Sequence, residues 1–353
     1  MTDSIRETIG CDLGDRNSEL CILTASGEME RPKRVKTTRV AFRAFFSGRL
    51  PAHVVIEVGT HSRWVNEELT ALGHRVTVAN PRRVQLITAS DTKTDRNDAE
   101  LLARLGRADV ELLSPVEHRA SEVQADLAVA KARDLLVTTR TRLVLCIRGM
   151  TKSFGERLPA CDAESFHRRA RSGVPEVLKP ALEPLFATLE AVEKQLDVYE
   201  TELAKLAKRY PEVEAVRQPN GVGVLTALVF MLTLEDKKRF EKSRMAGAFL
   251  GMVPRRDQSG DSDKQLHITK AGDPFVRRLL VNAANYILGP FGTDSDLRRW
   301  GLRLAERGGK NARKRAKVAV ARKLAVLMHR LWVTGEVYEP LRNANRLTKQ
   351  AAA

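Results

Sequence analysis

Residues 53–79 read HVVIEVGTHSRWVNEELTALGHRVTVA, and this stretch decides the fold class. It begins and ends with short apolar runs that are typical of strands, and a helical pattern lies between them near residues 62–72. The same alternation extends over residues 8–110, with further apolar runs IGCDLG and ELCIL and further helical stretches near 38–48 and 95–106. The sequence therefore predicts an α/β domain over residues 1–112.

A turn signal, TASGE, follows the run ELCIL and leads into a polar segment. Such a turn favours a hairpin of antiparallel strands. We therefore expect a sheet that mixes antiparallel and parallel strands rather than a purely parallel one.

Composition indicates a multidomain protein without a membrane span. The chain has 353 residues, which suggests two or three domains, and it has no apolar run near the ~18 residues that cross a bilayer and no signal peptide. We expect a bacterial cytoplasmic protein associated with the nucleoid. No CxxC pair is present, so we predict core thiols rather than zinc ligands or disulfides at the four cysteines, Cys11, Cys21, Cys146 and Cys161.

The charge balance favours a polyanionic partner. Lys and Arg number 60 against 44 Asp and Glu, which gives a formal net charge of +16. The stretch from Arg298 to Arg330 contains twelve Lys or Arg and one acid, Glu306. A solvated helix is the plainer interpretation, but so one-sided a run repels itself unless an anion neutralises it, and we predict contact with nucleic-acid phosphates, including at Arg313, Lys314 and Arg315.

Residues 113–210 show a different pattern, with two long helical stretches separated by a linker near residues 154–175. The second stretch repeats apolar residues at alternating spacings of three and four, the heptad seam of a coiled coil. A seam between two chains and a helical hairpin with residues 119–149 of the same chain are both compatible with this pattern. The seam consists of Leu182, Leu185, Leu189, Val192, Leu196, Tyr199, Leu203, Leu206 and Tyr210.

The third segment, residues 211–353, is predicted to be mainly helical, with glycine and proline interruptions. Its first helix follows QPNGVGV, in which Gly221 and Gly223 form a turn that leaves backbone amides available at a helix start. The turn resembles a helix-hairpin-helix motif that binds a DNA backbone, and a tight connection is the plainer alternative.

Four acidic residues of the first domain form an ordered set. Asp12 follows the apolar run IGC, and Glu57 lies within the run VVIEVG. Asp95 and Asp98 lie three positions apart at the start of a helix, so they share one helical face. Such carboxylates repel one another when they are brought together, and a divalent cation relieves the repulsion. Oxygen-only ligands select Mg²⁺ or Mn²⁺, whose chemistry suits phosphoryl transfer on nucleic acid.

Each acid also has a simpler explanation: Asp12 could close a turn, Glu57 could be a paired surface charge, and Asp95 could cap its helix. The order of two strand acids and a helical acid pair resembles the ribonuclease-H-like (RuvC-like) fold of Holliday-junction resolvases.

Two longer stretches resemble the DEDD transposases of the insertion-sequence one-ten family. EVGTHSRWVNEELTALGHRVTVANPRRVQLITASDTKTDRNDAELLARL, residues 57–105, is similar to their N-terminal signature. AFLGMVPRRDQSGDSDKQLHITKAGDPFVRRLLVNAA, residues 248–284, resembles their second conserved domain. The resemblance, with the helical middle, covers nearly the whole chain.

The resemblance implies that Asp12, Glu57, Asp95 and Asp98 hold metal and that Ser259 is the nucleophile. It further implies an element-encoded noncoding RNA, the bridge RNA, that pairs with donor and target DNA. It also implies a homo-oligomer, a dimer or tetramer, in which active sites combine domains from different subunits.

Ser259 alone would be an ordinary turn residue. Its activator is left open between the metal site and a nearby carboxylate, Asp257 or Asp261, because His267 is the one histidine close in sequence. Basic residues around it could hold a phosphate: Arg255, Arg256, Lys264, Lys270, Arg277 and Arg278.

Three alternatives to an RNA-guided serine recombinase remain at this stage. A metal-dependent junction nuclease would use water as its nucleophile and needs only the acids. A sugar or acetate kinase is suggested by CDLGDRN but does not explain the net charge. A non-catalytic architectural binder of DNA or RNA would make the acids incidental.

Overall fold

The computed structural model describes residues 7–81, 94–309 and 311–343, apart from the side chain of Gln265. Part of the N-terminal signature, residues 82–93, and Lys310 of the basic run lie outside the described residues. The chain divides into two compact units, Met1–His118 and Arg119–Ala353. The predicted boundaries at residues 112 and 210 stay predictions.

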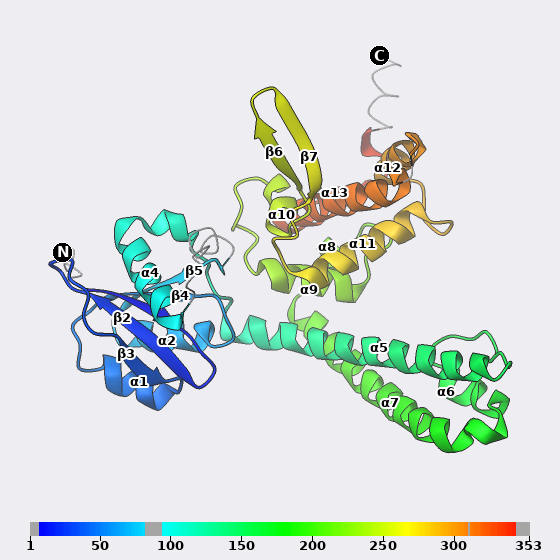
Figure 1. Ribbon diagram of the computed structural model, residues 1–353. Coiled ribbons are helices and arrows are strands. Elements are labelled where there is room, and N and C mark those ends of the chain that lie inside the picture. Colours follow the sequence, from blue (N-terminus) through cyan, green and yellow to red (C-terminus); the bar gives the residue numbers. More distant parts are fainter. Residues whose placement is uncertain (1–6, 82–93, 310, 344–353) are drawn as a thin grey trace, which may run out of the picture. The chain divides into compact units, whose positions relative to one another are not determined.

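The first unit contains a sheet whose five described strands are β1 (Thr8–Asp12), β2 (Asn17–Leu23), β3 (Lys33–Lys36), β4 (His53–Glu57) and β5 (Arg75–Ala79). Their order is β3-β2-β1-β4-β5 (Figure 1). Strands β1, β2 and β3 pair antiparallel, whereas β4 is parallel to both β1 and β5. The predicted mixed sheet is confirmed.

Helices cover both faces of this sheet, which is why β4 reads as a continuous apolar run. Val54 and Ile56 lie in a buried cluster with Phe42 of α1 (Arg39–Phe46) and Leu69 of α2 (Ser62–Ala71). Val55, between them in sequence, points to the other face, where Leu102 of α4 (Asp95–Ala108) buries it. All three predicted helices are confirmed.

The second unit begins with a helical hairpin. Helices α5 (Ser121–Ser153) and α7 (Lys179–Arg209) run side by side, with the short helix α6 (Phe166–Arg169) in the connection between them (Figure 1). Ion pairs link them, from Arg133 to Glu200 at 2.6 Å and from Arg140 to Glu193 at 3.1 Å. Most of the heptad seam is buried here: Leu182, Leu189, Val192, Leu196, Leu203 and Leu206. The seam therefore packs within the chain, as the hairpin alternative predicted, and a further contact between chains stays a prediction.

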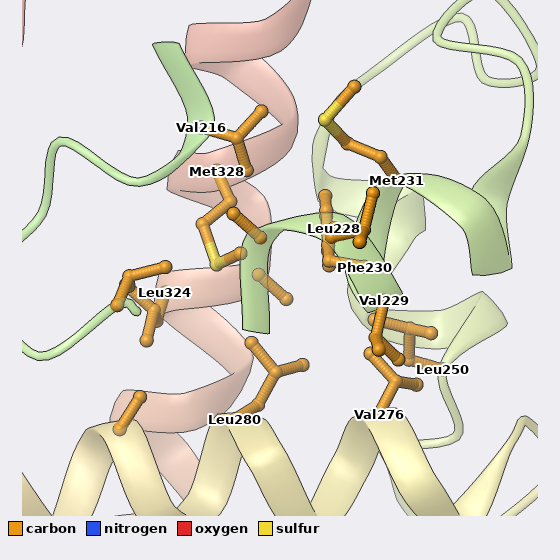
Figure 2. Close-up of a cluster of buried hydrophobic side chains, with 14 of the residues drawn as sticks. Val216, Leu228, Val229, Phe230, Met231, Leu250, Val276, Leu280, Leu324 and Met328 are labelled. Atoms are coloured by element: carbon orange, nitrogen blue, oxygen red, sulfur yellow. The ribbon is translucent and has the colours of Figure 1, made fainter. Parts of the chain in front are cut away.

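The remaining helices surround α9 (Val224–Leu234), which is buried from Thr226 to Leu234. A helix that is apolar on all sides belongs in a core. Figure 2 shows its Val229 beside Val276 of α11 (Pro274–Leu288), and the same buried cluster includes Leu324 of α13 (Ala312–Thr334). The surrounding elements also include α8 (Val213–Val216), α10 (Arg244–Phe249) and α12 (Asp296–Glu306).

One antiparallel ribbon interrupts this helical body, formed by β6 (Pro254–Ser259) and β7 (Ser262–Ile268) (Figure 1). The predicted mainly helical character of the third segment is confirmed. In the part of the chain that the structure describes, no helix is long and apolar enough to span a membrane.

The cysteine prediction is only half right. Cys11 and Cys21 are buried in the first unit, as expected of core thiols. Cys146 is exposed on α5 and Cys161 is only partly buried, because both lie in the thin helical hairpin, which has too little depth to cover every small side chain.

The contact between α4 and β1 yields a first prediction. A methyl group added at Gly10 would overlap the carbonyl oxygen of Ala99 and lie 2.5 Å from the amide nitrogen of Ala103. Gly10→Ala should therefore destabilise the first unit by about 3 kcal/mol, because backbone atoms rather than flexible side chains must move. Thermal unfolding measures this loss. Gly48→Ala is the matched control, since a methyl group there meets nothing within 4 Å; equal melting temperatures for the two variants would contradict the packing argument.

A second prediction concerns pH. His53 is 5% exposed and shares a 2.8 Å hydrogen bond with Thr77. Burial, with a smaller contribution from the charge of Arg75, lowers the pKa of His53 to about 4. Between pH 6.5 and 4 the unfolded chain binds a proton that the folded chain does not, so stability falls as pH falls through this window.

The expected loss is about 2 kcal/mol after allowance for solvent screening, and it is complete near pH 4. Hydrogen exchange of the β4 amides at pH 7 and pH 4 measures it. His53→Gln keeps a polar partner for Thr77 and should flatten the pH dependence; an unchanged dependence would assign the effect to other groups.

Candidate catalytic and nucleic-acid-binding residues

The two strand acids lie at the same edge of the sheet. Asp12 is the last residue of β1 and Glu57 is the last residue of β4. These strands are parallel, with Cys11 aligned with Ile56, so the two carboxylates follow in register one position later. Both residues are partly exposed. The fold therefore places them as neighbours at the carboxyl ends of adjacent strands.

Helix α4 brings its acids toward that edge. Near its start, Ala99 lies against Gly10 of β1, and the Arg96 carbonyl accepts from the thiol of Cys21, which is level with Gly10. Two turns later, Arg107 donates to the carbonyl oxygens of Thr24 and Ala25, which lie beyond the level of Thr8 at the start of β1. The helix thus runs back along the sheet and begins at the edge where the strands end. Asp95 and Asp98 both belong to its first turn.

The capping explanation for Asp95 is wrong. Thr94 is the N-cap residue, and its hydroxyl accepts a 3.2 Å hydrogen bond from the amide of Asn97. Asp95 follows the cap and is exposed. Its carboxylate still benefits from the positive end of the helix dipole, as acids in a first turn do.

The chemical type of the four acidic side chains suits a hard divalent ion. All four side chains offer oxygen, and the nearby thiols are poor competitors, because burial, with a smaller contribution from Asp12, raises the pKa of Cys11 far above its usual range. Burial likewise raises the pKa of Cys21. Among residues 7–81, 94–309 and 311–343, however, no three such side chains are grouped closely enough to hold a metal ion.

Ser259 lies on the β6–β7 ribbon rather than in an irregular loop. It is the last residue of β6 and pairs in register with Ser262, the first residue of β7. Gly260, at φ 55°, takes the first position of the turn, where glycine is favoured. Every described side chain from Arg255 to Lys264 is exposed. The serine is therefore presented at the accessible tip of a ribbon.

Strand register divides the side chains of the ribbon between two faces. Ser259 shares its face with Ser262, Asp257 and Lys264, because Asp257 is two positions away and is aligned with Lys264. Arg256 and Asp263 lie on the opposite face and form a 2.8 Å ion pair. A carboxylate and an ammonium group thus lie beside the serine.

Besides Arg256, which pairs with Asp263, two more of the predicted phosphate-binding arginines have partners within the protein. The guanidinium of Arg277 donates to the carbonyl oxygens of Leu250 and Gly272. Arg278 forms a 2.5 Å ion pair with Asp134. The Arg277 contacts hold the segments that flank the ribbon to α11, and the Arg278 pair joins α11 to α5. Of the remaining predicted residues near Ser259, Arg255, Lys264 and Lys270 are exposed.

The glycine turn has the form that the sequence indicated. Gly221 adopts φ 90°, and a methyl group there would lie 3.0 Å from the Tyr286 ring. Gly223 is the N-cap residue of α9. Because glycine has no side chain, it cannot accept a hydrogen bond from the first backbone amides of that helix. This arrangement can accept a phosphate, and it also serves as a close connection.

The basic run is only partly available to a ligand. Arg298 donates to backbone carbonyl oxygens, Arg299 pairs with Asp294 at 2.6 Å, and Arg330 pairs with Glu336. Exposed basic side chains remain on α12, in the following turn and along α13: Arg303, Arg307, Arg313, Lys314, Arg315, Arg322 and Lys323. The basic surface available to a ligand therefore consists of these residues.

One feature had no signal in the sequence. A cavity of about 270 Å³ is lined by residues from three distant segments, represented by Asn220, Thr293 and Tyr338. Only the fold brings these segments together, so no local pattern could have identified it.

Comparison with known proteins agrees with the fold class. The DEDD model of IS110 transposases matches residues 9–154, and the model described as "Transposase IS116/IS110/IS902 family" matches residues 213–291. A transposase for insertion sequence element IS1111A from Coxiella burnetii is 30% identical over 340 residues, which cover 94% of this chain and 90% of that protein. A transposase for insertion sequence element IS1328 from Yersinia enterocolitica is 27% identical over 281 residues, 78% of this chain and 82% of that protein.

These matches span both units and identify an enzyme that acts on DNA. They therefore exclude the sugar or acetate kinase and the non-catalytic architectural binder. The first unit is the RuvC-like domain of the DEDD type, a class of domain that typically uses divalent metal. The chain belongs to the IS116/IS110/IS902 family of transposases.

Proposed function

We propose that this transposase cuts and rejoins donor and target DNA through a covalent link between Ser259 and a DNA phosphate. The observation that carries the proposal is the position of Ser259, at the exposed tip of a ribbon beside Lys264 and Asp257. A nucleophile must reach a phosphate that is itself part of a bulky duplex, and a projecting ribbon permits such an approach.

The first step exchanges one ester bond for another. The hydroxyl oxygen of Ser259 bonds to phosphorus, the bond from phosphorus to one sugar oxygen breaks, and that oxygen takes up a proton from solvent and leaves as a hydroxyl group. The serine proton passes to a nearby carboxylate, and Lys264 offsets charge that develops on the phosphate. A sugar hydroxyl of the exchanged strand then attacks the phosphoserine and restores Ser259, so the cycle needs no ATP.

We assign Asp12, Glu57, Asp95 and Asp98 as the residues that hold a divalent ion, Mg²⁺ foremost and Mn²⁺ as a substitute. Their support is the shared sheet edge and their oxygen-only chemistry. When bound, the ion supplies Lewis-acid stabilisation of charge on the phosphate and the leaving oxygen. The carboxylates must move closer together to bind it, and the ion would offset the resulting repulsion.

Target choice is assigned to an element-encoded noncoding RNA that pairs with both DNA partners. In such a system the protein binds backbone and shape, and the exposed basic residues Arg313, Lys314 and Arg315 suit that role. The acids and the serine belong to different units of the chain. We therefore also propose a dimer or tetramer, assembled through the α5–α7 hairpin, in which one subunit's acids serve another's serine.

The serine step predicts a protein–DNA adduct. With Mg²⁺, RNA and labelled element-junction DNA, a denaturing gel should show DNA attached to the protein, and Ser259→Ala should abolish this band. Ser262→Ala is the matched control, because it removes a hydroxyl from the directly opposed position of the same ribbon and should leave the adduct in place. Cleaved DNA with free ends in the Ser259 variant would instead indicate a metal-dependent hydrolytic nuclease.

The metal assignment predicts that Asp12→Asn weakens Mn²⁺ binding at least about 100-fold, because a direct ligand is lost. Electron paramagnetic resonance measures the binding, and adduct formation in Mg²⁺ should fall in parallel. Asp15→Asn removes an exposed carboxylate three residues away, whose side chain lies 3.8 Å from His61, and should change neither quantity. Equal effects of the two substitutions would overturn the assignment.

A further inference from the structure

The cavity of about 270 Å³ in the second unit is lined by apolar and uncharged polar side chains. It is slightly smaller than the roughly 300–1,000 Å³ of sites for drug-sized molecules, so it fits one ring system rather than a whole nucleotide. Polar groups of Asn220, Thr293 and Ser295 are among its lining. Gln218 and Tyr338 also line it, and the remaining lining residues are apolar: Pro219, Ile287, Leu297 and Pro340.

Hydrogen bonds hold the walls in place. The Asn220 side-chain amide donates to the Thr293 hydroxyl at 2.7 Å, which joins the glycine turn to the loop between α11 and α12. The backbone amide of Tyr338 donates to the Gln218 side chain at 2.7 Å, which fixes the third segment. A ligand would therefore meet a preformed site and would not have to order it.

An exposed aromatic ring lies two positions from the cavity lining. Phe291 precedes Thr293 on the α11–α12 loop and is 77% exposed. The loop is braced, because the guanidinium of Arg298 donates to the carbonyl oxygens of Ile287 and, at 2.7 Å, Gly289. An apolar ring held out in water on a braced loop loses little conformational freedom when it stacks on a ligand.

We propose that Phe291 and this cavity together bind an unstacked base of single-stranded DNA. Base–aromatic stacking needs an open face on both rings, which an unpaired base offers and a base within a duplex does not. The mainly apolar walls and few polar groups of the cavity suit the face and edge of the same base or its neighbour. Helix α12 follows the loop and carries exposed Arg303, and exposed Arg307 is the C-cap residue of this helix; both offer positive charge to the adjoining phosphates.

DNA is the occupant because strand exchange leaves unpaired bases next to the cut, and the family membership establishes DNA as the substrate. The proposal does not depend on the serine link. It can be measured in the Ser259→Ala background, where no adduct is expected, so its failure would leave the proposed chemistry untouched.

The test compares Phe291→Ala with Phe154→Ala, which removes an exposed ring at the end of α5. Fluorescence anisotropy would measure dissociation constants for a duplex with a four-nucleotide gap and for the intact duplex. Phe291→Ala should weaken binding of the gapped DNA about tenfold and leave duplex binding unchanged, whereas Phe154→Ala should change neither. The slope of affinity against salt should match the native chain, because no charge is removed.

Phe291→Trp provides a direct readout of stacking. Its added tryptophan emission, relative to the native chain with Trp64, Trp300 and Trp332, should be quenched by the gapped DNA and not by the duplex. Equal loss of affinity for both DNAs, or no quenching, would overturn the proposal. Tighter binding of the same sequence as RNA, with the same dependence on Phe291, would overturn the assignment to DNA.

Discussion

The close approach of α4 to β1 is the constraint on which the arrangement of the acids depends. Gly10 has no side chain, and the backbone of the helix occupies the space where one would lie. This contact lets α4 pack directly on β1, with the first turn that carries Asp95 and Asp98 toward the edge of Asp12 and Glu57. Four carboxylates separated by up to 86 positions thus depend on the absence of one methyl group.

The sequence predicted most of the first unit because its signals are local. Alternating apolar runs and helical periodicity located the strands and helices, and two strand acids with a helical pair indicated the sheet edge. The heptad seam was ambiguous, because a hairpin and a dimer bury the same stripe of Leu182, Leu189 and Leu196. Local pattern also misassigned the cap at Asp95, since only backbone geometry distinguishes it from Thr94.

What the sequence could not predict lies in contacts between distant segments. The roles of Arg277, Arg278 and Arg298 as internal braces, rather than as a uniform basic surface, follow from carbonyl oxygens and a carboxylate that the fold supplies. The same holds for the cavity beside Asn220. Counting charges therefore overestimated the surface available to nucleic acid, although the exposed run along α13 remains.

The β6–β7 ribbon has a consequence for the timing of the reaction. A ribbon of two strands with both described faces in water is marginally stable, because it gains little from hydrophobic burial. The position of Ser259 is then held by strand hydrogen bonds, one turn glycine and the Arg256–Asp263 pair. Any surface that covers the ribbon would narrow the range of positions of the serine. If Ser259 is the nucleophile, as proposed, it would be least ordered in solution and best positioned in an assembled complex, which would restrain cutting outside that complex.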